Sequence, residues 1–163
     1  GLKVAWRRVF ASNDPFSVPF ERGVEVACVA YPTVGYHLSE AQYHSLHRAF
    51  EDQGPFYLAQ VEFQGEYLER GSQWLCEWPA YIDYFRIPLG LENALVAVNG
   101  SWGVLVSHEE HALVGARAHL LALARSCFPG WEQDLATLER DWKDADPQAR
   151  RWLVDIRTGL RQR

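Results

Sequence analysis

Four consecutive residues could bind a metal ion or exchange protons: His108-Glu109-Glu110-His111. Imidazoles and carboxylates are typical zinc ligands and acid–base groups. The zinc motif H-E-x-x-H places its two histidines four residues apart on a helix, so that both point at one ion. Here the histidines are three residues apart, and the rest of the sequence offers no identifiable further ligand.

Helix initiation accounts for the two glutamates more simply than a metal does. Ser107 and Glu110 fit the capping box S-x-x-E, and acidic residues in a first turn interact favourably with the helix dipole. The pattern predicts a helix over residues 109–127, with Leu120 on its buried face. We therefore expect no metal ion at His108 and His111.

A second histidine-bearing helix is predicted over residues 39–52. Ser39 and Gln42 fit another capping box. The solvent side of this helix would carry a stripe of two glutamates and two histidines, which we interpret as pairs on a solvated face. The alternative is a metal site, with candidate ligands Glu40, His44, His47, Glu51, His108 and His111.

Other chemical motifs are missing from the sequence. It has no G-x-S-x-G elbow, P-loop or G-x-G-x-x-G pattern. Cys28, Cys76 and Cys127 are far apart and form no C-x-x-C, so neither a disulfide framework nor a zinc site is predicted. Their apolar neighbours favour inert thiols. We expect no catalytic residue and no cofactor.

The order of elements predicts an α+β fold with a mainly antiparallel sheet. Residues 24–31 and 54–63 are rich in β-forming residues. Asn99-Gly100 predicts a hairpin over residues 95–106, with a type I′ turn and Val98 paired with Ser101. Both faces of this hairpin are apolar, including Trp102, so we expect it in the centre of the sheet.

Helical patterns fill the end of the chain. After the helix at 109–127, residues 131–143 and 147–160 show apolar spacing typical of amphipathic helices. With the helix at 39–52 this makes about four helices, three of them C-terminal. No repeat or long linker interrupts the 163 residues, so we predict a single domain over 1–163.

Aromatic residues are concentrated between positions 72 and 88. This segment, broken by two prolines, predicts two short strands or a strand and an irregular loop. Because interfaces draw heavily on Trp and Tyr, it is a candidate partner-binding surface, although the same rings could fill the core. The candidate binding residues are Trp74, Trp78, Tyr81, Tyr84 and Phe85.

Charge indicates the kind of partner. The chain has a formal net charge of −5, but residues 147–163 carry five Arg and one Asp, which leaves −9 for residues 1–146. That acidic body should repel nucleic acid. No apolar run is long enough to span a membrane and no signal peptide is evident, so we expect a cytoplasmic protein.

Two functions remain. The first is a non-catalytic binding protein, such as an acidic inhibitor or immunity-type protein for a basic protein partner. The alternative is a small metal-dependent hydrolase or metal-binding protein that uses the histidine-rich helices.

Overall fold

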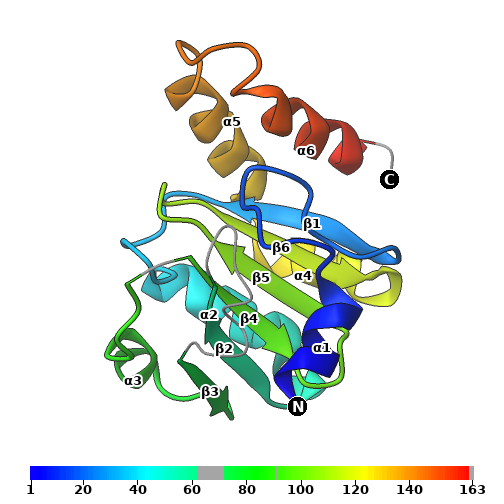
Figure 1. Cartoon of the computed structure of the whole chain (residues 1–163), viewed down its shortest axis with the longest axis vertical. Coiled ribbons are helices and arrows are strands. Elements are labelled where there is room, and N and C mark those ends of the chain that lie inside the picture. The colour runs from blue at the N-terminus through cyan, green and yellow to red at the C-terminus, as the bar shows by residue number, and fades with distance from the viewer. Residues whose placement is uncertain (62–71, 91, 162–163) are drawn as a thin grey trace.

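The computed structural model describes residues 1–61, 72–90 and 92–161. Six strands form one antiparallel sheet in the order β1-β6-β5-β4-β2-β3 (Figure 1). The strands are β1 (Val24–Ala30), β2 (Phe56–Gln60), β3 (Gln73–Cys76), β4 (Asn93–Ala97), β5 (Trp102–Val106) and β6 (Ala112–Arg117). The predicted fold class, α+β with a mainly antiparallel sheet, is confirmed.

The described residues form six α-helices, two more than the four predicted. They are α1 (Leu2–Val9), α2 (Glu40–Phe50), α3 (Tyr81–Phe85), α4 (Ala118–Cys127), α5 (Trp131–Asp141) and α6 (Arg151–Arg161), and a 3₁₀ turn, η1 (Glu51–Gln53), follows α2. None of them combines the length and the apolar character that crossing a membrane would require.

Helices cover both faces of the sheet. One core holds α2, α3 and α4 against the sheet, and a second core holds α1, α5 and α6 against the opposite face. Along β5, Trp102 and Val104 belong to the first core and Leu105 to the second. Burial on both faces explains why this strand reads as a continuous apolar run.

The central hairpin is confirmed, but its turn differs from the predicted type. Leu95 pairs with Val104 as expected. The Gly100 amide donates to the Ala97 carbonyl at 2.9 Å, and Gly100 has φ +74°. Among the described non-glycine residues, positive φ occurs at Trp78 and Glu110, not at Asn99. The turn is therefore not type I′, which needs positive φ at both central residues.

The helix predicted over 109–127 is wrong in its first half. Residues 112–117 form β6, which pairs with both β1 and β5, and α4 begins only at Ala118. Ser107 caps no helix: its hydroxyl accepts the Glu109 amide at 3.0 Å inside the β5–β6 turn. The strands on either side, β1 and β5, supply hydrogen-bond partners for the backbone of β6 and bury it. This pairing outweighs the preference for a helix that the Ser107–Glu110 pattern indicates.

The remaining boundaries follow local signals more closely. Ser39 and Gln42 form the predicted capping box at the start of α2. The strand predicted over 54–63 is β2, and residues 62 and 63 lie outside the described part of the chain. The segment 72–88 forms the short strand β3 and, instead of a second strand or loop, the helix α3.

Hydrogen bonds join α5 to the residue that follows β1. Tyr31, just after β1, donates its hydroxyl hydrogen to Asp141 at 2.6 Å and its amide to Asp134 at 3.3 Å. Residues 147–150 form a turn before α6 rather than its first turn. Four apolar residues of α6 are buried, as the amphipathic pattern of this segment indicates: Trp152, Leu153, Ile156 and Leu160.

Candidate functional site

The two histidines of α2 pair separately with glutamates, one in α2 and one in η1. His44 Nε2 lies 3.6 Å from Glu40 Oε1, and His47 Nε2 lies 3.2 Å from Glu51 Oε2. The His47 ring also stacks on Trp78, with ring centroids 4.8 Å apart. Across residues 1–61, 72–90 and 92–161, no group of three His, Cys, Asp or Glu side chains is placed to hold one metal ion.

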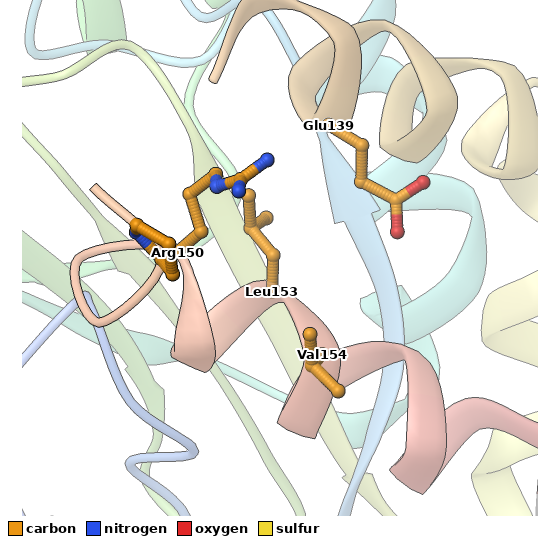
Figure 2. A pocket seen from close by; sticks show the side chains of 5 residues that line it. Glu139, Arg150, Leu153 and Val154 are labelled. Atoms are coloured by element: carbon orange, nitrogen blue, oxygen red, sulfur yellow. The ribbon is translucent and has the colours of Figure 1, made fainter. Parts of the chain in front are cut away.

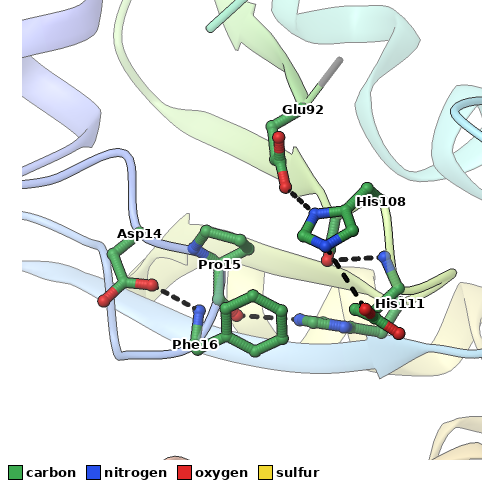
Figure 3. Close-up of polar contacts among 8 residues, drawn as sticks. Asp14, Pro15, Phe16, Glu92, His108 and His111 are labelled. Atoms are coloured by element: carbon green, nitrogen blue, oxygen red, sulfur yellow. Dashed lines mark hydrogen bonds and ion pairs between the residues drawn. The ribbon is translucent and has the colours of Figure 1, made fainter. Parts of the chain in front are cut away.

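His108 lies in the β5–β6 turn and points its Nδ1 at Glu92, the residue before β4 (Figure 3). The Glu92 side chain is 9% exposed. The other ring nitrogen of His108, Nε2, lies 3.3 Å from Glu109. The hydrogen bond to Glu92 and the charges of both carboxylates raise the pKa of His108, against a smaller effect of burial. The contact is an ion pair when the imidazole is protonated.

His111, only three residues away, has different partners. Its ring is fully buried, donates from Nε2 to the Pro15 carbonyl at 2.8 Å and stacks on Trp152 with centroids 4.7 Å apart. Burial lowers the pKa of His111 to about 4, so the ring is neutral at physiological pH. The two histidines of the opening motif thus act separately: carboxylates favour the protonated form of His108 near the surface, and burial favours the neutral form of His111 in the core.

The thiols of the two buried cysteines, Cys28 and Cys76, are poor nucleophiles. Burial raises the pKa of the Cys28 thiol far above its ordinary value, and it raises that of Cys76 to about 11. A protonated thiol reacts slowly, because the thiolate is the nucleophile.

The five aromatic candidates divide between core and surface. Tyr84 is fully buried, and its hydroxyl accepts the Leu38 amide at 2.9 Å. Trp78 is half-buried and donates its indole N–H to the Gly54 carbonyl at 3.1 Å. Trp74 and Tyr81 are half-buried, whereas Phe85 is 38% exposed. Tyr84 therefore cannot present its ring to a partner.

The exposed side chains of α3 continue onto α2. The His44 ring lies 6.3 Å from Tyr81, and Tyr81 lies 5.6 Å from Phe85. Ile82, which no sequence pattern singles out, is also on α3 and is 51% exposed. We call this surface the α2–α3 patch; it consists of Glu40, His44, Tyr81, Ile82, Asp83 and Phe85.

A pocket of about 390 Å³ lies between α5 and α6 (Figure 2). Its charged wall residues are already engaged within the protein. Both carboxylate oxygens of Glu139 accept hydrogen bonds from Arg157 at 2.6 Å, and Arg150 Nη1 donates to the Lys143 carbonyl at 2.8 Å. These contacts favour a structural role, in which the charges join the two helices.

Sequence analysis missed Glu92, although it is the most important partner of His108. Glu92 precedes His108 by 16 residues. The one feature of the local sequence that marks Glu92 is its position as an acidic residue directly before an apolar strand. No protein family, curated protein or solved structure matches this chain. Function is therefore inferred from the arrangement of its own side chains.

Proposed function

We propose that the chain is a non-catalytic binding protein that docks a basic protein on the α2–α3 patch. The observation that carries this proposal is the exposure of Ile82 (51%) and Phe85 (38%) on a helix whose opposite side buries Tyr84. Docking would remove their apolar surface from water, which is favourable. Aromatic side chains are also enriched where protein partners bind most strongly.

Charge around the patch supports a basic partner. Glu40 of α2 and Asp83 of α3 are both exposed. Burial, and next the negative charge of Glu40, raise the pKa of Tyr81, which places this carboxylate close to the ring. An Arg or Lys side chain could lie over the Tyr81 or Phe85 face and pair with a carboxylate. The −9 charge of residues 1–146 would speed its approach.

The partner class that these features suit is a basic enzyme that acts on nucleic acid. Such an enzyme binds phosphates with clustered Lys and Arg. An acidic surface with an apolar centre could occupy that cleft and exclude the substrate, as an inhibitor or immunity-type protein would.

The alternative function, a small metal-dependent hydrolase or metal-binding protein, draws on the Glu92–His108 pair. A buried carboxylate that orients an imidazole is a known arrangement for acid–base chemistry. However, His108 Nε2 faces Glu109 at 3.3 Å, and the two carboxylates favour the protonated ring. A base or a metal ligand needs the neutral imidazole, which these contacts disfavour, so this alternative ranks second.

The test is to isolate the untagged protein from its native cell, identify co-purifying proteins and measure the affinity of the purified partner. Phe85→Ser and Ile82→Ser should each weaken binding about tenfold or more, as loss of an interface anchor does. Val154→Ser is the matched control, because Val154 is 62% exposed on α6.

Three results would contradict the proposal. They are a partner that is acidic, a partner that binds both patch variants as tightly as the wild type, and a lack of any partner together with a reproducible hydrolase activity that His108→Gln abolishes.

A further inference from the structure

A second pocket, of about 540 Å³, lies between α6 and the loop that follows α1. Phe16 and Val18 of the loop line it together with Trp152 of α6. The Phe16 and Trp152 rings meet edge to face, with centroids 5.6 Å apart. This volume falls in the range of about 300 to 1,000 Å³ that is common for small-molecule sites.

The pocket holds one positive and one negative side chain that are not neutralised within the protein. Arg151 and Asp155 both line it and both are exposed. In the described part of the chain, neither takes part in a side-chain hydrogen bond or an ion pair. They are four residues apart on one helix, so their Cβ atoms are about 5–6 Å apart. The pocket of Figure 2 differs, because its acidic wall residue, Glu139, is already paired with Arg157.

Trp152 lines the pocket with its ring, and its indole N–H is buried. Its side chain is 5% exposed, and its indole N–H finds no acceptor among the described residues. Buried polar groups are nearly always hydrogen-bonded, because an unpartnered one loses its bond to water without replacement. The indole nitrogen is closed off from solvent, so a ligand in the pocket would meet the ring of Trp152 and not its N–H.

We propose that this pocket binds a free apolar amino acid. Arg151 would pair with the carboxylate, and Asp155 would pair with the ammonium group. The apolar side chain would pack on Phe16 and Val18. A free amino acid carries its carboxylate and its ammonium group on the same carbon atom. Arg151 and Asp155, one helical turn apart, could therefore contact both charges of one molecule. A longer peptide, with its charged ends far apart, does not allow this.

The experiment is a ¹H–¹⁵N NMR titration of the full chain with three probes. They are L-leucine, leucinamide, which lacks the carboxylate, and N-acetylleucine, which lacks the ammonium group. Leucine should shift the Trp152 indole resonance in a saturable way, and each analogue should bind about tenfold more weakly. The absence of a saturable shift at millimolar leucine, or equal binding of all three probes, would overturn the proposal.

Substitutions of the two exposed pocket residues test which charge of the ligand each of them binds. Arg151→Gln should lose the preference for leucine over leucinamide, and Asp155→Asn should lose the preference for leucine over N-acetylleucine. Arg22→Gln and Asp144→Asn are matched controls, since they change the net charge equally at exposed sites that do not line the pocket. If the pocket variants discriminate among the probes as the wild type does, the assignment is wrong.

Discussion

The imidazole of His108 and the buried carboxylate of Glu92 tie the β5–β6 turn to the start of β4 (Figure 3). The same turn holds the neutral ring of His111 against the Pro15 carbonyl. Two histidines three residues apart are thus stabilised in opposite protonation states, and they should respond to pH in opposite directions.

The stabilising contribution of His108 should be lost as the solution becomes alkaline. Its pKa is raised in the folded state, so its contribution is fully present below about pH 6.5, the ordinary value, and is lost as the pH rises through the folded-state value. Urea denaturation of the wild type and of His108→Gln should therefore differ more at pH 6 than at pH 9. An equal difference at both pH values would contradict an ion pair with Glu92.

His111 should limit stability in acid. Burial lowers its pKa from 6.5 to about 4, so the unfolded chain binds a proton that the folded chain rejects. The free energy of unfolding should fall by up to about 3 kcal/mol between pH 6.5 and pH 4 for this reason. His111→Gln should lose this part of the acid sensitivity, whereas His108→Gln should retain it. The comparison requires chemical denaturation of all three proteins across this range.

Two glycine substitutions should change stability in opposite directions. A Cβ at Gly115 would lie 2.5 Å from the Phe20 ring, so Gly115→Ala should destabilise the protein by about 1–3 kcal/mol through overpacking. A Cβ at Gly159, inside α6, would meet no atom within 4 Å. Gly159→Ala should therefore stabilise by about 0.5–1 kcal/mol, because alanine loses less entropy in a helix. Thermal unfolding of both variants measures these changes. An unchanged melting temperature for Gly115→Ala, or a lower one for Gly159→Ala, would contradict the packing described at that position.

Leu120 and Leu123, three residues apart on α4, should differ sharply in their contribution to stability. Leu120 is 4% exposed in the first core, whereas Leu123 is 43% exposed. Leu120→Ala should cost about 2–5 kcal/mol, because it removes buried methyl groups and leaves a cavity. Leu123→Ala should cost much less. Similar losses for the two variants in chemical denaturation would show that the buried face of α4 is misassigned.

If a basic partner docks on the α2–α3 patch, the association rate should fall markedly from low to physiological salt. Exposed charges are screened over about 8 Å at physiological salt but only over about 30 Å at 0.01 M, so steering weakens as salt is added. Glu40→Lys and Asp83→Lys should slow association more than Asp144→Lys, which reverses an exposed charge outside the patch. Stopped-flow or surface-binding kinetics would measure this, and equal effects of the three reversals would show that the partner docks elsewhere.

The sequence by itself determined the features that neighbouring residues control. The Ser39–Gln42 capping box begins α2 as predicted, because the donors and acceptors of a cap lie within one turn. The apolar runs beside Asn99-Gly100 place β4 and β5 in the centre of the sheet, since strands buried on both faces need apolar residues throughout.

Tertiary structure alone decided the features that depend on distant residues. Residues 112–117 have apolar spacing that fits a helix or a strand, and pairing with β1 and β5 makes them a strand. Glu92 meets His108 across 16 residues, and Phe16 meets Trp152 from opposite ends of the chain. Such contacts form only when the sheet and its helices pack, because no local pattern encodes which distant side chains will become neighbours.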